Sequence, residues 1–302
     1  MLPRRKFRLK LRSRTLILGP RTLVMGVLNV TPDSFSDGGN FLSQEKAVQH
    51  ALQMERDGAD LIDIGAESTR PGSLGITAEE EWSRLAPVLA ALRTRLTIPV
   101  SIDTRKSEIV AKAIESGAEI INDVSGLNHD PRIAEISARA RVPLVLMHMR
   151  GDPQTMQQKP FARDAVKDVI HGLRASLLIA RKAGVHNSQI VLDPGIGFGK
   201  SYTQNYRLLA NLPQLAKLGF PLLVGTSRKG FIAKTLADNA SLAPSSRPPA
   251  IASELKIWGT AATVTASILH GAHIVRVHDV AQMALVARVA DCILNPAQAP
   301  KN

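Results

Sequence analysis

Eight short apolar segments alternate along the chain with stretches that have the pattern of helices, and this alternation limits the fold more than any other feature. The segments are rich in Val and Ile and apolar on both faces, as strands buried in a parallel sheet are. They occupy residues 23–29, 60–65, 98–103, 118–122, 142–148, 189–193, 220–227 and 272–278. Eight strand–helix units in 302 residues predict an α/β fold, a closed (β/α)8 TIM barrel rather than an open sheet.

Helix signals fill the gaps between these segments. Thr77 and Glu80 have the spacing of a capping box that opens an amphipathic run. Residues 106–116 have the pattern of a helix that Gly117 ends, which gives a compact β-α-β unit. We find no internal repeat and no domain boundary, so we expect one domain over residues 1–302. Residues 237–249 are predicted to be a mobile loop on the barrel rim, inert in its simplest interpretation, and residues 295–302 a frayed tail.

The net charge of +12 is concentrated at the start of the chain, where residues 1–21 contain eight cations and no acid. Such a segment is typical of a nucleic-acid-binding arm or of an organelle transit peptide. However, residues 7–12 alternate apolar and charged side chains, which is the period of a half-exposed strand. We therefore favour a basic β-hairpin over residues 1–21 that closes the bottom of the barrel, and we expect no nucleic-acid partner.

Apolar runs and cysteine content bear on the cellular location. The longest apolar runs, such as residues 142–147, are far too short to cross a bilayer, so no membrane partner is expected. The single cysteine, Cys292, cannot form an internal disulfide. With no secretory signal pattern at the start, a cytoplasmic location is the simplest expectation.

Polar residues end most of the apolar segments. Because TIM-barrel enzymes work at the carboxyl ends of their strands, these residues are expected to meet at one rim and to form a binding site. A single strand-end Asp is as often a helix cap or a loop anchor, so the prediction rests on the whole set. The set comprises Asn29, Asp63, Asp103, Asn122, His148, Asp193, Lys229, Arg276 and His278.

The types of these residues suggest a ligand. Carboxylates that accept two parallel N–H bonds suit the edge of a 2-aminopyrimidinone ring, and the planar Arg276 can stack on a flat heterocycle. Asn29, Thr69, Arg70 and His278 suit an anion such as pyrophosphate, although another polar ligand would fit the same spacing. Residues 31–39 and 66–72 have the composition of lid loops, with inert βα loops as the alternative. Residues 193–200 are glycine-rich but match no phosphate-binding fingerprint.

Several motifs resemble those of the dihydropteroate synthases. Residues 25–39, MGVLNVTPDSFSDGG, resemble the first signature of that family, and residues 63–72, DIGAESTRPG, resemble the second. Further matches follow in family order to about residue 285: SIDT at 101–104, IND at 121–123, MHM at 147–149, DPG at 193–195, SRK at 227–229 and RVHD at 276–279. The resemblance implies a transferase that condenses 6-hydroxymethyl-7,8-dihydropterin pyrophosphate with p-aminobenzoate, with sulfonamides as inhibitors and a homodimer as the assembly.

The same resemblance implies a role for each matching residue. The residues implied to bind the pterin are Asp103, Asn122, Met147, Asp193, Lys229 and Arg276. Those implied to bind pyrophosphate are Asn29, Thr69, Arg70, Arg276 and His278, and Asn29 is also implied to be the ligand of a Mg2+ cofactor. The residues implied to form the p-aminobenzoate pocket are Phe35, Thr69, Pro71, Phe198, Ser227, Lys229 and Gly230. Catalytic roles are implied for Asp33 in the closing loop, for Asp103 and for Lys229.

The implied reaction displaces pyrophosphate with an arylamine, which is unprotonated at neutral pH and needs no strong base. The larger demand is to stabilise the charge of the leaving group, for which Mg2+, Arg70 and His278 are expected. Three features depart from the family pattern: Ala66 replaces a frequent glycine, Gly230 replaces a frequent serine, and the segment between Lys229 and Arg276 is longer. With glycine at position 230, the carboxylate of p-aminobenzoate is expected to be bound by backbone N–H groups at the start of a helix.

Two other functions share part of this residue pattern. A pterin-binding methyltransferase of the same barrel superfamily would share the pterin residues, but it is not expected to carry the first signature or the SRK motif. A pterin-binding or nucleic-acid-binding paralogue without turnover should have lost some of the polar strand-end residues, yet all are present. The synthase is therefore the favoured prediction.

Overall fold

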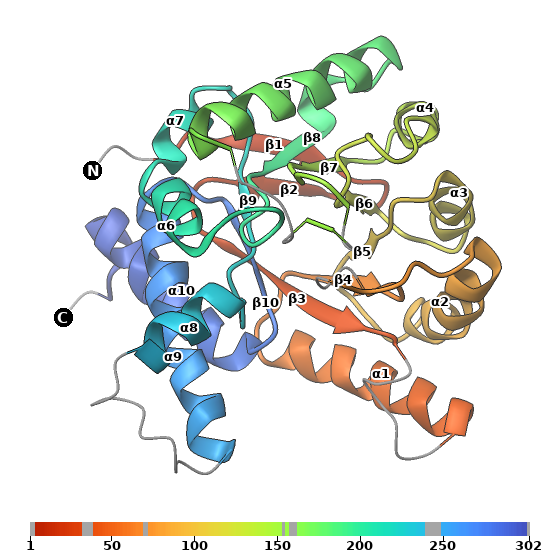
Figure 1. Ribbon diagram of the computed structural model, residues 1–302. Helices are drawn as coiled ribbons and strands as arrows, with labels where there is room; N and C mark the ends of the chain where they lie inside the picture. Colours follow the sequence, from red (N-terminus) through yellow and green to blue (C-terminus); the bar gives the residue numbers. More distant parts are fainter. Residues whose placement is uncertain are drawn as a thin grey trace.

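Eight parallel strands form the centre of the molecule, in the order β8-β7-β6-β5-β4-β3-β10-β9. The computed structural model describes residues 4–31, 39–68, 72–152, 155–156, 162–238 and 249–300, and only the backbone of 39–43, 238 and 249–254. A parallel bridge between Leu192 and Leu222 joins the two outer strands, so the predicted barrel is confirmed (Figure 1). The strands are β3 (Leu23–Asn29), β4 (Leu61–Gly65), β5 (Val100–Asp103), β6 (Ile120–Asp123), β7 (Leu144–Met147), β8 (Ile190–Asp193), β9 (Leu223–Val224) and β10 (Ile274–Val277).

Helices surround this barrel and bury one face against it (Figure 1). Thr77 caps α2, since its Oγ1 accepts the N–H of Glu80 at 3.2 Å, which is one half of the predicted capping box; the Glu80 carboxylate instead accepts from Arg84. The helices are α1 (Gly39–Arg56), α2 (Ala78–Leu92), α3 (Ser107–Glu115), α4 (Arg132–Ala140), α5 (Ala165–Lys182), α6 (Tyr202–Ala210), α7 (Leu212–Ala216), α8 (Gly230–Asp238), α9 (Pro249–Leu269) and α10 (Val280–Leu294). No helix in the described ranges is long and apolar enough to cross a membrane.

Strand β9 is much shorter than the predicted segment 220–227. Only Leu223 and Val224 pair with β10, and the chain then turns to place Arg228 in the left-handed region, with a φ of 57°. Arg228 forms an ion pair with Asp279, and this pair joins the turn after β9 to the turn after β10. The early end of β9 therefore brings the two last loops of the barrel together.

The basic N-terminal segment forms the predicted hairpin. Strands β1 (Phe7–Lys10) and β2 (Thr15–Leu18) pair antiparallel. Leu9, Leu11 and Leu18 are buried against the barrel interior, where they pack in one cluster with residues of the barrel strands such as Met25 and Val191. The hairpin thus closes the amino-terminal end of the barrel, opposite the strand ends that carry the candidate site.

Several cations of this segment have internal partners. Arg4, whose side chain is 2% exposed, forms an ion pair with Asp291 of α10 at 2.5 Å. Arg21 pairs with Asp60, and Arg12 donates to the carbonyl oxygen of Ile114. Part of the positive charge at the chain start is therefore used to fix the hairpin to the barrel.

The chain end differs from the prediction of a frayed tail. A 3-10 helix, η3 (Pro296–Gln298), follows α10, and the Gln298 side chain donates to the carbonyl oxygen of Pro20 at 2.6 Å. This contact with the N-terminal segment orders the tail to that point. The predicted loop at 237–249 falls mostly outside the described residues, between α8 and α9.

Leu18→Ala tests the role of the hairpin in stability. Leu18 is fully buried in the cluster at the barrel bottom, so we expect the substitution to lower the free energy of unfolding by about 2–5 kcal/mol in urea denaturation. Ile17→Ala on the same strand is the control, because Ile17 is 43% exposed, and it should cost less than about 1 kcal/mol. Equal losses from the two variants would contradict the assignment of the hairpin as a buried closure.

Candidate active site

The carboxyl ends of β4, β5, β6 and β10 carry a cluster of four polar side chains. The guanidinium of Arg276 donates from Nε to Oδ2 of Asp63 at 2.6 Å and from an NH2 group to Oδ2 of Asp103 at 2.8 Å. The amide of Asn122 donates to Oδ2 of Asp63 at 2.9 Å. The structure therefore brings together three predicted pterin residues, Asp103, Asn122 and Arg276, around Asp63.

Two buried acceptors in this cluster are unused. Within the described part of the chain, Oδ1 of Asp63 and Oδ1 of Asn122 are buried without a hydrogen-bond partner. An unsatisfied buried acceptor costs about 1–3 kcal/mol, so such atoms mark a place where a ligand is expected to donate. The cluster is thus prepared for a molecule with several N–H groups.

The charge balance of this cluster shifts the pKa values of its members. Burial raises the pKa of Asp103 to about 7, although the charge of Arg276 works in the opposite direction. Burial alone would lower the pKa of Arg276, but the carboxylates of Asp63 and Asp103 raise it above its usual value. Arg276 therefore stays charged, while the Asp103 carboxyl group can gain or lose a proton near neutral pH.

Asp193 and Met147 lie next to each other at the ends of β8 and β7. Oδ1 of Asp193 accepts the N–H of Gly195 at 2.7 Å. Gly195 has a φ of 65°, and a side chain there would lie 1.9 Å from the carbonyl oxygen of His148, so only glycine fits this turn. Burial raises the pKa of Asp193 to about 6, although the Gly195 N–H and the Lys229 charge lower it.

Lys229 and Phe198, in the loops after β9 and β8, contact each other. The ammonium nitrogen of Lys229 lies 4.0 Å from the centroid of the Phe198 ring, a cation–π contact. Gly197 permits this approach, because a Cβ at that position would lie 3.0 Å from Cδ of Lys229. Burial, and then the charge of Arg276, lower the pKa of Lys229 to about 8. Two residues predicted for the p-aminobenzoate pocket are therefore in contact.

Ser227 positions His278. Oγ of Ser227 accepts the backbone N–H of His278 and lies 3.1 Å from its Nδ1. Burial, together with the charge of Arg276, lowers the pKa of the imidazole to about 3, so it is neutral at pH 7. If the Ser227 hydroxyl donates to Nδ1, the ring proton lies on Nε2, which is then a hydrogen-bond donor. In that tautomer His278 would stabilise an anion as a neutral donor rather than as a cation.

Lys200 is a residue that the sequence pattern did not single out. Its buried ammonium group donates to the carbonyl oxygens of His148 at 3.1 Å and Phe198 at 2.8 Å. Burial lowers the pKa of Lys200 to about 7, although Asp193 raises it. Lys200 thereby ties the loop after β8 to the end of β7. The one available signal was a lysine just before the Ser201 cap of α6.

The structure describes some of the remaining predicted site residues but not the others. Asn29 is half-buried at the end of β3, and Gly230 begins α8 with open space around its Cα among the described residues. The predictions for Asp33, Phe35, Thr69, Arg70 and Pro71 lie outside the described residues. The base of the second loop is fixed by Lys106, whose ammonium bonds to Glu67 at 2.8 Å and to the buried Glu81 at 2.5 Å.

Comparisons with known proteins agree with this arrangement. A family model described as pterin binding enzyme matches residues 25–278. The chain is 46% identical to a dihydropteroate synthase of Synechocystis over 275 residues, or 91% of each chain. It is also similar to the solved structure of a Xanthomonas albilineans dihydropteroate synthase with 4-aminobenzoic acid, with a TM-score of 0.85, 39% identity and coverage of 98% and 100% of the two chains. A Yersinia pestis dihydropteroate synthase with a sulfonamide drug complex gives a TM-score of 0.83 at 38% identity, with the same coverage.

Asp63→Ala tests the cohesion of the polar cluster. The substitution removes one of the two carboxylates that bind Arg276, and the same carboxylate accepts the hydrogen bond from Asn122. We therefore expect the free energy of unfolding, measured by denaturant titration, to fall by about 3–5 kcal/mol. Asp57→Ala is the matched control, since Asp57 bonds to Gln53 on the exposed side of the molecule and should cost less than about 0.5 kcal/mol. A loss for Asp63→Ala no larger than that of the control would show that the cluster does not hold the strand ends together.

Proposed function

The chain belongs to the family of pterin-binding enzymes, and we propose that it acts as a dihydropteroate synthase. It condenses 6-hydroxymethyl-7,8-dihydropterin pyrophosphate with p-aminobenzoate to give 7,8-dihydropteroate and pyrophosphate. The observation that carries the proposal is the group of buried, unused acceptors beside Arg276, because the 2-aminopyrimidinone edge of a pterin offers several N–H donors. The similarity to named synthases over nine-tenths of both chains favours this activity over the methyltransferase alternative.

We assign the pterin floor to residues of β5, β6, β8 and β10. The carboxylates of Asp103 and Asp193 and the amide of Asn122 are the acceptors for ring N–H groups. Arg276 is held by its edge between two carboxylates, which leaves the flat face of the guanidinium for stacking on the ring. Met147, buried beside Asp193, adds an apolar contact.

We assign the second substrate to the space beside Phe198 and Lys229. The aromatic ring of p-aminobenzoate suits the Phe198 side, and its carboxylate suits the N-terminus of α8, where a helix presents backbone N–H groups to an anion. Gly230, where the family often has serine, offers one fewer hydroxyl donor, and a Cβ at this position would meet no atom within 4 Å. The Xanthomonas relative with 4-aminobenzoic acid supports a site of this kind, and the Yersinia relative supports sulfonamides as competitors for it.

The chain's own groups can assist bond cleavage in two ways. The Nε2–H of the neutral His278 donates to the departing pyrophosphate, and the positions of Thr69 and Arg70 in the second signature add further donors. The Asp103 carboxylate, held beside the pterin by Arg276, steadies positive charge that develops on the ring. The arylamine attacks the methylene carbon, the carbon–oxygen bond to pyrophosphate breaks, and the amine loses its proton to solvent.

We propose Mg2+ as the cofactor, carried to the site with the pyrophosphate. In the described part of the chain no three His, Cys, Asp or Glu residues are grouped to hold a metal ion. Mg2+ usually keeps several waters and binds to few protein groups together with substrate phosphates, so the amide oxygen of Asn29 would serve as its protein ligand. When bound, the ion would neutralise charge on the leaving group.

We also propose a homodimer. Three apolar side chains at a spacing of four residues, Leu285, Val289 and Ile293, form a stripe along α10 and are 71%, 61% and 56% exposed. Trp258 of α9, the helix packed against α10, is 64% exposed. Contiguous exposed apolar residues of this kind are typical of a protein–protein interface.

Release of pyrophosphate by the purified protein tests the proposed reaction. We expect release that requires the dihydropterin pyrophosphate, p-aminobenzoate and Mg2+ together, detected with a coupled phosphate assay. Lys229→Ala should lower kcat/KM by about 100-fold or more, because it removes the half-buried cation placed beside both substrates. Lys182→Ala at the end of α5 is the control and should retain full activity. Near-normal turnover by Lys229→Ala would refute its assignment, and no release by the unaltered protein would refute the synthase.

Pterin affinity should depend on pH through Asp193. The carboxyl group accepts two parallel N–H bonds only when it is ionised, and its pKa in the free protein is about 6. Acid therefore opposes binding, and we expect the Kd of an unreactive pterin to rise at least about tenfold between pH 7 and pH 5, since Asp103 gains a proton over the same range. Fluorescence titration measures this, and Asp193→Asn should bind weakly with a smaller pH dependence. Tighter binding at pH 5 than at pH 7 would contradict the role of Asp193.

A further inference from the structure

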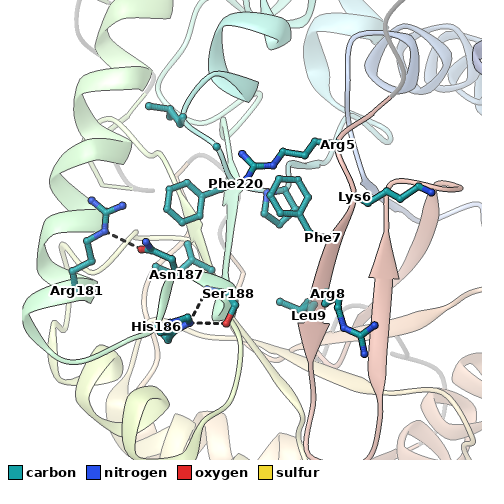
Figure 2. Close-up of a pocket in the computed structure, with 14 residues that line it drawn as sticks. Arg5, Lys6, Phe7, Arg8, Leu9, Arg181, His186, Asn187, Ser188 and Phe220 are labelled. Carbon is teal, nitrogen blue, oxygen red and sulfur yellow. Dashed lines mark hydrogen bonds between the residues drawn. The ribbon is translucent and has the colours of Figure 1, made fainter.

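A cavity of about 490 Å³ lies at the end of the barrel opposite the active site. It is bordered by β1 on one side and by the segments that lead into β8 and β9 on the other (Figure 2). These segments enter the amino-terminal ends of their strands, so the cavity is separated from the catalytic rim by the packed barrel interior. Its volume is in the range of small-molecule sites.

The inner wall of the cavity is apolar and aromatic. Phe7 of β1 and Phe220, just before β9, both line it, and Leu9 and Ile190 form its floor with at most 1% exposure. Phe7 is fixed by an edge-to-face contact with His273, whose ring centroid lies 5.2 Å away. The rings of Phe7 and Phe220 therefore offer a preformed apolar space for a flat ring.

Two guanidinium groups stand beside these rings. The guanidinium carbon of Arg5 lies 5.2 Å from the centroid of the Phe7 ring, and that of Arg181 in α5 lies 5.7 Å from the centroid of the Phe220 ring. Neither forms an ion pair with a described carboxylate, in contrast to Arg4 and Arg21 of the same N-terminal segment. Arg181 donates to the amide oxygen of Asn187, which is neutral. No acidic residue is among those that line the cavity.

We propose that this cavity binds a small anion that carries a flat aromatic ring. The ring lies in the apolar space beside Phe7 and Phe220, and the acidic group, a carboxylate, sulfonate or phosphate, is bound by Arg5 and Arg181. Arginine is suited to this role because its planar fork bonds two anion oxygens while its face stays on an aromatic ring. The site is separate from the proposed synthase site and does not depend on it.

A polyanion such as a nucleic acid is the rival occupant of this basic segment. It would be held by the exposed cations Lys6, just before β1, and Arg8 and Lys10 of β1, and it would not need the aromatic side chains. In Figure 2 Lys6 and Arg8 point away from Phe220, whereas Arg5 points toward it. The two guanidinium groups without an ion pair, beside the half-buried ring of Phe7 and the buried ring of Phe220, favour the small aromatic anion.

Binding of 2-naphthoate, observed by ligand-detected NMR on the full-length protein, tests the proposal. We expect saturable binding, at least tenfold tighter than that of 2-naphthamide, which has the same ring without the charge. Arg5→Gln and Arg181→Gln should each raise the Kd at least fivefold, and thermal melting should show that both remain folded. Lys10→Gln is the control and should change the Kd less than twofold, because Lys10 is an exposed cation of β1 outside the cavity.

Three outcomes would overturn the proposal. The first is binding that saturating pterin and p-aminobenzoate displace, since the probe would then occupy the active site. The second is binding that is equal for 2-naphthoate and 2-naphthamide or unchanged in both arginine variants. The third is an oligonucleotide that binds more tightly than the probe and loses affinity equally in Lys10→Gln and Arg5→Gln, which would show an open basic surface instead.

Discussion

Arg276 connects strands that are not neighbours in the barrel. From β10 its guanidinium reaches past β3 to carboxylates on β4 and β5, and the amide on β6 joins through Asp63. Charges taken out of water are costly unless they are paired and hydrogen-bonded, so each member of this group depends on the others. The pairing leaves two acceptors free, and it is these that make the barrel mouth a site for a molecule with N–H donors rather than a closed structural network.

The shifted pKa values around the mouth follow from the same burial. The pKa values of Asp103 and Asp193 are raised, and those of Lys229 and Lys200 are lowered. Carboxyl and ammonium groups, whose pKa values differ widely in water, therefore have pKa values between about 6 and 8 here. Small changes in the surroundings, such as the arrival of a polar ring, then decide which groups carry charge. The pKa of His278 lies below this range, at about 3, so its imidazole is neutral at pH 7.

The strand periodicity and the polar strand ends were enough to predict the barrel and the meeting of Asp103, Asn122 and Arg276. The contacts of Lys200 were not predictable, because its partners are backbone carbonyls brought close by the turn at Gly195. The neutrality of His278 depends on burial by several elements at once. The short β9 depends on a left-handed turn at Arg228, which residue types alone do not indicate.

The ion pair between Arg4 and Asp291 joins residues 287 positions apart. Strand β3 likewise pairs with β10, the last strand to be made. At the usual pace of translation, roughly 15 to 60 s separate the synthesis of these partners. Through that interval β3 is an unpaired edge on one side, and the apolar face of the hairpin lacks the β8, β9 and β10 residues that cover it. The nascent chain is therefore exposed to association with other chains until its C-terminal quarter leaves the ribosome, a period in which chaperones would act on it.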